Sequence, residues 1–210
     1  MYPFNQAVKS LLEIAHRCAQ KGWLPATSGN LSVRLNGHPL SMAITRSGCD
    51  KACLKTEDII VVDERMQVMS GYAGKPSAET SVHVGLYEKF PDIACILHVH
   101  TIFNNLLSER YFSISEGTGH IPFAQHELLK ALGHWEEKAS INIPIVPNYA
   151  NLERLGQAVT EAAYRDVPGV LVHRHGIYAY GESPEAALRH LEAFEFLFEY
   201  HWRLNQAASS

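Results

Sequence analysis

Hydrophobic residues recur every three or four positions along several segments of the chain, which is the spacing of an amphipathic helix. The first such segment runs from Val8 to Cys18, with Asn5 as the expected N-cap and Gly22 as the expected end. Ser183 followed by Pro184 is typical of a helix start, so a long helix should close the chain. The other predicted helices span residues 77–90 (capped by Ser77), 102–109, 123–132 and 151–165, and the closing helix spans 184–205.

Between these helices, short apolar segments bounded by turn residues predict strands. Segments 31–35 and 41–45 are joined through Asn36-Gly37, which predicts a hairpin, and segments 59–62 and 66–69 predict a second one. Further strands are expected over 94–100 and 141–146, and one more from Val170 through His175 to Tyr180. Hairpins followed by alternating helices and strands predict an α/β fold, a three-layer αβα arrangement with a largely antiparallel mixed sheet covered by helices on both faces. Nothing resembling a linker or a repeat divides the chain, so residues 1–210 are expected to form one domain.

Composition narrows the class of protein. Of the 210 residues, 46% are hydrophobic and 19% charged, which is enough apolar surface for a folded core. Eighteen basic against 22 acidic residues leave a net charge of −4, so nucleic acid is not an expected partner. The longest apolar stretches are much shorter than the roughly 20 residues of a membrane-spanning helix. With no secretory signal pattern and four cysteines in no C-x-x-C pair, a cytoplasmic protein is expected.

Histidine provides the strongest chemical signal, with 12 in the chain. His98 and His100 lie two apart at the end of a predicted strand, so both imidazoles should face the same side and could bind one cation. The alternative is a pair of hydrogen-bonded core histidines. A second pair, His173 and His175, could supply a third ligand. Three imidazoles with one open position are typical of a catalytic zinc site.

Several histidines compete for the third ligand position. His175 is weakly favoured over His173 because it precedes Gly176, which allows close backbone approach, but spacing alone does not decide between them. The less favoured candidates are His83, His120 and His126.

Three segments predict an anion site. Each combines glycine with hydroxyl or amide side chains beside a strand end or a helix start: 26–30, 45–51 and 74–79. Taken singly, each segment is most often an ordinary turn. Together, with Lys51 and Lys75 beside them, the three segments predict a phosphate-binding site. No P-loop, dinucleotide or serine-hydrolase motif is present. For proton transfer the candidates are Glu79 and Glu127, with a solvated helix face as the alternative for both.

Taken in order, the Ser-Gly-Asn at 28–30, the Ser-Gly at 47–48, the Pro-Ser-Ala-Glu at 76–79, the H-x-H and the His-Gly at 175–176 resemble the class II aldolase/adducin family from about Val8 to Tyr200. Segments 22–32 and 47–51 and the residues around Glu127 look most like its dehydratases of phosphorylated ketoses. The resemblance implies one Zn²⁺ per subunit held by His98, His100 and His175, and a homotetramer with the active site near a subunit boundary.

The resemblance also implies site roles. Phosphate would be held around Asn30, Ser47, Gly48 and Ser77, with Lys51 close by; Ala78 departs from the aldolase pattern, in which a second serine is common. The acid/base glutamate of the dehydratases matches Glu127, and the corresponding carboxylate of the aldolases matches Glu79. The expected reaction is dehydration of a phosphorylated ketose through an enediolate. A sugar-phosphate aldolase or epimerase on the same scaffold is the alternative, and a non-catalytic adducin-like module is a remote one because all three metal ligands are present.

Overall fold

The computed structural model describes residues 2–208 of the chain. Its nine strands form one sheet in the order β3-β2-β1-β4-β9-β8-β7-β6-β5. Every neighbouring pair is antiparallel except β7 and β8, which confirms the predicted mixed, largely antiparallel sheet. The strands are β1 (Asn30–Arg34), β2 (Ser41–Thr45), β3 (Ile59–Asp63), β4 (Cys95–Val99), β5 (Phe112–Ser113), β6 (Thr118–Ala124), β7 (Ser140–Val146), β8 (Gly169–Val172) and β9 (Gly176–Gly181).

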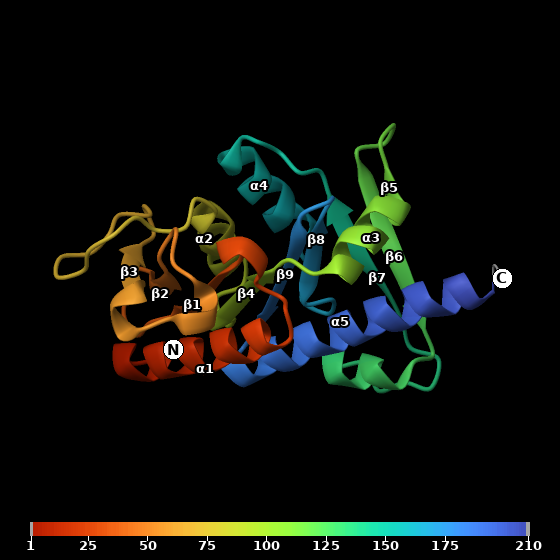
Figure 1. Ribbon diagram of the computed structural model, residues 1–210, viewed down its shortest axis with the longest axis horizontal. Coiled ribbons are helices and arrows are strands. Elements are labelled where there is room, and N and C mark those ends of the chain that lie inside the picture. The colour runs from red at the N-terminus through yellow and green to blue at the C-terminus, as the bar shows by residue number, and fades with distance from the viewer. Residues whose placement is uncertain (1, 209–210) are drawn as a thin grey trace.

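Helices cover both faces of this sheet, as predicted (Figure 1). On one face, α1, α3, α5 and the short 3₁₀ helix η4 bury a core that includes Leu97; on the other, α2 and α4 bury one that includes Ile96. Neighbouring residues of β4 serve opposite cores because side chains alternate along a strand. The helices are α1 (Phe4–Gln20), α2 (Thr80–Lys89), α3 (Ile102–Tyr111), η4 (Glu127–Leu132), α4 (Leu152–Ala162) and α5 (Pro184–Ala207).

The predicted helix over 123–132 is wrong. Residues up to Ala124 belong to β6, in which Gly119, Ile121 and Phe123 are buried and their neighbours exposed. Gln125 then turns the chain with a φ of 54°, and only residues 127–132 are helical. Leu128 and Leu132 of η4 lie four and eight residues after Ala124 of β6, which is also the spacing expected within a single longer helix.

The single strand predicted over 170–180 is also wrong. It is a hairpin of β8 and β9 in which Val172 pairs with Gly176, and Arg174 at its tip has a φ of 51°. His173 and His175 therefore lie in a turn instead of on one face of a strand. Conversely, the second predicted hairpin is reduced to one bridge between Val62 and Val68. Met66 has a φ of 62°, and of the returning segment only Val68 packs against the core.

Two predicted caps are displaced. Asn5 lies inside α1, whose N-cap is Pro3. Ser77 does not cap α2: its Oγ accepts from the backbone of Glu79 at 3.3 Å, which forms a turn before the helix, and Glu79 becomes the N-cap. Ser183 caps α5 as predicted. In residues 2–208, no helix combines the length and the apolar character needed to cross a membrane.

Candidate active site

Three imidazoles meet where the end of β4 lies beside the start of β9. His98 lies on β4, His100 directly follows that strand, and His175 directly precedes β9. Because His98 pairs with Tyr178 and Val99 with Ile177, the antiparallel register brings the β8–β9 turn to His100. The Nε2 atom of His98 is 2.9 Å from that of His100 and 3.4 Å from that of His175. The prediction that these three side chains share one space is confirmed in geometry.

The ring orientations suit a divalent metal. The Nδ1 atom of His98 donates to the backbone carbonyl of Ile177 at 3.0 Å, which leaves the Nε2 lone pair directed at the other two rings. Burial lowers the pKa of His98 well below its ordinary value and that of His100 to about 4, so both are neutral, as metal ligands must be. Tetrahedral zinc with Zn–N bonds of 2.0–2.1 Å needs nitrogens about 3.3 Å apart, close to the spacing found.

Gly176 allows this close packing. A Cβ atom at this position would clash with the carbonyl of Val99 and lie 2.8 Å from Cδ2 of His100 and 2.9 Å from Cε1 of His98. The close backbone approach predicted from the His-Gly pair is thus present, and it explains why His175 reaches the centre.

Glu79 faces the same point from the N-terminus of α2. Its Oε1 atom is 3.1 Å from Nε2 of His175, and its Oε2 atom is 3.3 Å from Nε2 of His98. Burial acts to raise the pKa of Glu79, but the imidazoles of His98 and His175 and the amide of Asn30 lower it by a larger amount. The carboxyl is therefore ionised. A carboxylate beside three imidazole nitrogens can complete a metal's ligand sphere or transfer a proton to a bound substrate.

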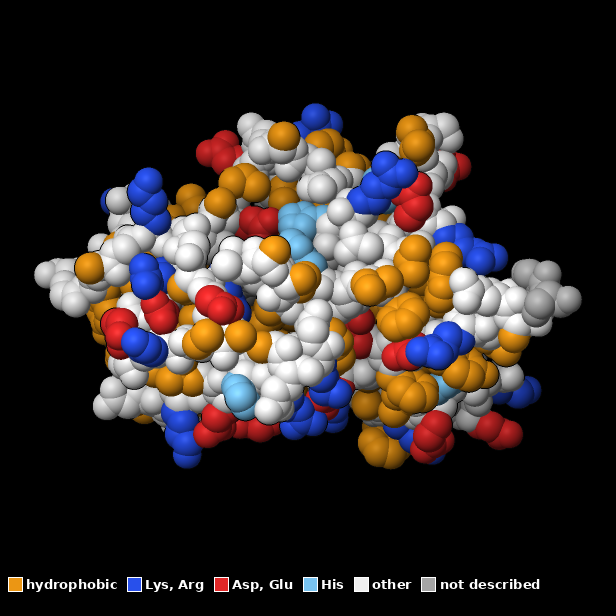
Figure 2. Space-filling model, viewed as in Figure 1, with side chains coloured by type: hydrophobic (Ala, Val, Ile, Leu, Met, Phe, Trp, Pro, Cys, Tyr) orange, Lys and Arg blue, Asp and Glu red, His pale blue; other side chains and the backbone are white. Residues whose placement is uncertain are grey.

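A cavity of about 350 Å³ opens beside the imidazoles and contains the predicted phosphate residues. Figure 2 shows histidine side chains gathered in a hollow near the middle of the visible face, next to an acidic side chain. The lining consists of residues from the three predicted segments together with His100 and Leu152: Thr27, Ser28, Gly29, Asn30, Arg46, Ser47, Gly48, Lys51, Ser77, Ala78 and Glu79.

Within the lining, two of the predicted polar groups, Lys51 and Asn30, already have protein partners. The buried Lys51 ammonium donates to the carbonyls of Thr27 at 2.8 Å and Cys49 at 3.1 Å, so it ties two loops together and has one further proton for a ligand. The side-chain amide of Asn30 donates through Nδ2 to Glu79 at 2.7 Å, and its Oδ1 atom contacts the ring of His83. Ser47 and Gly48 are exposed to the cavity, where an anion could reach them.

Glu127 lies apart from the other predicted residues. It begins η4, its side chain is 78% exposed, and it forms an ion pair with Lys130 at 2.9 Å. It does not line the cavity that holds Glu79 and His100. Within the single chain, the structure therefore brings together all the predicted site residues except this one.

The competing histidines have other environments. His173 contacts Glu109 at 2.8 Å and stacks on Phe112, so it points away from His175. His126 caps η4 by accepting from Leu128, and His120 is exposed on β6.

Asn105 supports the candidate metal site but was not among the residues predicted from the sequence. Its side-chain amide donates to the carbonyls of His175 and Thr101, both at 2.9 Å, and thereby joins the His175 turn to the segment that follows His100. The only sequence signal was its position four residues after Thr101, one helical turn along α3.

We expect Asn105→Leu to lower the affinity for a divalent metal by about 10–100-fold, since loss of a group that orients a ligand has effects of this size. Chelator competition measures the affinity without turnover. Asn142→Leu, the same exchange at an exposed position of β7, is the control. An unchanged affinity in Asn105→Leu would contradict this role.

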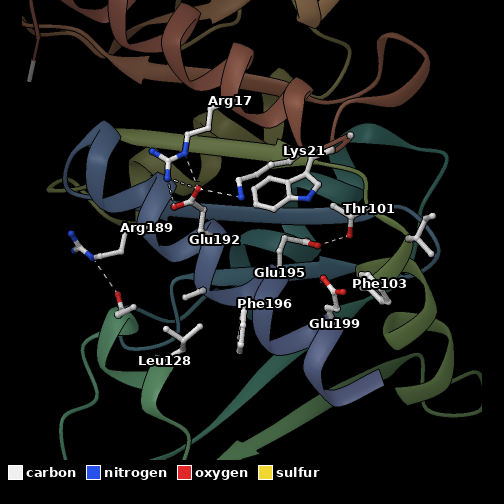
Figure 3. A pocket seen from close by; sticks show the side chains of 15 residues that line it. Arg17, Lys21, Thr101, Phe103, Leu128, Arg189, Glu192, Glu195, Phe196 and Glu199 are labelled. Carbon is white, nitrogen blue, oxygen red and sulfur yellow. Dashed lines mark hydrogen bonds and ion pairs between the residues drawn. The ribbon is translucent and has the colours of Figure 1, made fainter. Parts of the chain in front are cut away.

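A second cavity of about 610 Å³ lies on the other side of the His100–Thr101 segment, between the ends of α1 and η4 and the side of α5 (Figure 3). At its base, buried Glu195 accepts from Thr101 at 2.6 Å and from Asn104 at 3.2 Å. Burial raises the pKa of Glu195 to about 7, although these hydrogen bonds act to lower it. Its carboxyl group is thus protonated in the folded state at a pH where it is ionised in the unfolded chain.

This shift predicts a pH dependence of stability. The folded chain binds a proton more tightly than the unfolded chain, so the free energy of unfolding should fall as pH rises from about 5 to 8, by up to about 3 kcal/mol. Urea unfolding at fixed protein concentration should show that Glu195→Gln lacks this decrease, whereas Glu199→Gln, a neighbouring acid on the same helix, retains it. Parallel pH profiles for wild type and Glu195→Gln would contradict the prediction.

Comparison with known proteins gives the site its context. The chain is 44% identical to the methylthioribulose-1-phosphate dehydratase of Persephonella marina over 93% of this chain and 89% of that one. It is 42% identical to the dehydratase of that name from Bacillus subtilis, over 93% and 92% of the two chains.

Among solved structures, an L-fuculose 1-phosphate aldolase aligns with a TM-score of 0.76 at 22% identity, covering 96% of this chain and 87% of that one. A sugar-phosphate aldolase from Thermotoga maritima aligns with a TM-score of 0.73 at 20% identity, covering 97% and 96%. These structures share the fold described above. The model of the class II aldolase and adducin N-terminal domain matches residues 9–202, and the chain belongs to that family.

Proposed function

We propose that this protein, acting as one domain, is a divalent-metal-dependent lyase that dehydrates 5-methylthioribulose 1-phosphate to 2,3-diketo-5-methylthiopentyl 1-phosphate, a step of methionine salvage in the cytoplasm. The observation that carries the proposal is the meeting of three imidazoles with an ionised carboxylate beside a polar cavity. The relatives above, similar over nearly the whole chain, support the choice of substrate.

We propose that His98, His100 and His175 hold the metal and that it is zinc, since imidazole nitrogens at this spacing suit that ion. A divalent ion there would polarise the C2 carbonyl and C3 hydroxyl of the ketose and stabilise the negative charge that develops when C3 loses its proton. The chain then needs a base for the C3 proton, an acid for the departing C4 hydroxyl and a group that holds the phosphate.

The phosphate would lie among Ser47, Gly48 and Ser77, with the remaining proton of Lys51 directed at it and one free amide proton of Asn30 nearby. Gly48 has a φ of 75° and nothing within 4 Å of a Cβ built on it, so an anion could approach its backbone amide. Binding of the C1 phosphate at this position would place C2 and C3 of the ketose next to the imidazoles.

Glu79 is the carboxylate that already faces the imidazoles, so within one subunit it is the group in place for proton transfer. We propose that Glu127 acts as the principal acid/base, and its exposed position requires that it serve the cavity of another subunit. A homotetramer would provide this arrangement. Large apolar side chains that are exposed in the single chain support such an assembly; they include Ile102, Phe196, Tyr200 and Leu204.

Two substrates test the proposed reaction. With 5-methylthioribulose 1-phosphate the metal-loaded protein should form the diketone, and with L-fuculose 1-phosphate it should release no aldehyde. Aldehyde from the second substrate without diketone from the first would replace the dehydratase by an aldolase on the same scaffold. Epimerised ketose as the sole product would replace it by an epimerase.

A further inference from the structure

A chain of buried hydrogen bonds runs between β1 and α2 and ends on Glu79. Asn30 and Ser32 lie two apart on β1, so their side chains share one face of the sheet. Glu79, His83 and Tyr87 lie four apart, so they share one face of α2. The two sets face each other, and their polar side chains alternate in space.

Each contact in this chain is short. The hydroxyl of Tyr87 is 2.9 Å from Oγ of Ser32, which is 2.7 Å from Nδ1 of His83. Nε2 of His83 contacts Oδ1 of Asn30, and Nδ2 of Asn30 donates to Oε2 of Glu79 at 2.7 Å. Ser32, His83 and Tyr87 have no exposed surface, and Asn30 is 3% exposed, so water does not reach the contacts that His83 makes with Ser32 and Asn30.

The chemistry of the groups allows one direction of donation. A carboxylate only accepts, so the amide of Asn30 must turn its NH₂ group to Glu79 and its oxygen to His83. That oxygen needs a donor, so the proton of the neutral His83 ring must lie on Nε2. Nδ1 then accepts from the hydroxyl of Ser32, which in turn accepts from Tyr87.

We propose that His83 is a positioning residue for Glu79: its Nε2–H tautomer holds the Asn30 amide in the one orientation that donates to the carboxylate facing the three imidazoles. The inference rests on the proposed function only in taking Glu79 as part of the active site. It extends that site into the sheet–helix interface: Asn30 lines the cavity, and His83, Ser32 and Tyr87 lie behind it.

The order of donors and acceptors in this series of hydrogen bonds distinguishes a positioning role of His83 from simple burial. Without a donor at position 83, the Asn30 oxygen loses its partner and the amide is free to turn, which would direct its oxygen at the carboxylate. Without the Tyr87 hydroxyl, Ser32 can still donate to His83, and the orientation of Asn30 persists. The two buried positions should therefore differ in their effect on catalysis even where they cost similar stability.

The tautomer is measured directly by ¹⁵N NMR of the histidine-labelled whole protein, with the His83 resonances assigned by comparison with His83→Gln. We expect a pyrrole-type Nε2 and a pyridine-type Nδ1, with and without bound zinc. A proton on Nδ1 would overturn the proposal. This readout needs no turnover, so it stands or fails separately from the identity of the reaction.

Three variants give the functional test. His83→Phe keeps a ring of similar size but no donor, and kcat should fall by about 10–100-fold with KM and bound metal little changed. His83→Gln retains an N–H that can reach Asn30 and should recover most of kcat. Tyr87→Phe, the matched loss of a buried polar group, should keep kcat within about threefold. Turnover in His83→Phe equal to wild type, or a kcat in His83→Gln no higher than in His83→Phe, would contradict the proposal.

Discussion

His98→Ala is expected to abolish both metal binding and turnover. Two imidazoles would remain of three, and the lost one is the completely buried ring whose Nδ1 atom is fixed by Ile177. Bound metal should fall from one ion per subunit to a trace. Since a metal supplies several kcal/mol of charge stabilisation, kcat should fall by at least about 1,000-fold. Elemental analysis of the dialysed protein and a diketone assay measure the two effects.

His173→Ala is the matched control, because it removes an imidazole from the same turn as His175 but one that contacts Glu109 instead of the centre. This variant should keep its metal and most of its turnover. If it lost the metal while His98→Ala retained a full equivalent, the ligand set proposed here would be wrong.

Mixing two inactive variants is expected to restore activity. Glu127→Gln should keep its metal but lose turnover by about 100–10,000-fold, the usual contribution of a general acid/base. His98→Ala keeps Glu127 but loses the metal. If Glu127 serves a neighbouring subunit, random reassembly of equal amounts should give about a quarter of wild-type activity, because about a quarter of the sites would pair an intact metal centre with an intact glutamate.

The control is a mixture of Glu79→Gln with His98→Ala. Glu79→Gln should itself lose turnover, because its carboxylate faces the imidazoles. Glu79 and His98 meet within one chain, so no pairing of these variants creates an intact site, and the mixture should stay inactive. If Glu127→Gln alone retained wild-type turnover, the acid/base role would pass to Glu79.

The sequence predicted the fold class because the strands at the centre of the sheet carry apolar segments that allow no other placement, as in β4, where every residue is buried. It failed where two periods overlap. Ala124 belongs to the alternating pattern of β6, where it is exposed, but it lies four and eight residues before Leu128 and Leu132 of η4, which is helical spacing. It also could not locate the turn at Arg174, because a left-handed φ at a non-glycine residue has no signature in composition.

The site was predicted in outline for a related reason. An H-x-H pair on a strand fixes its own geometry, so His98 and His100 could be predicted from local spacing. His175 needed the register of β4 against β9, and Asn105 and His83 act through contacts between distant elements that sequence spacing does not reveal. Glu127 was a candidate from its place at a predicted helix, but its acid/base role came only from the resemblance, and in the single chain it lies away from the imidazoles.

Anomalous diffraction from crystals of the zinc-loaded protein, recorded on both sides of the zinc edge, tests the central claim most directly. The account predicts one strong peak per subunit, about 2.0–2.1 Å from the Nε2 atoms of His98, His100 and His175. A zinc peak elsewhere, with these three rings hydrogen-bonded only to one another and to Glu79, would contradict it.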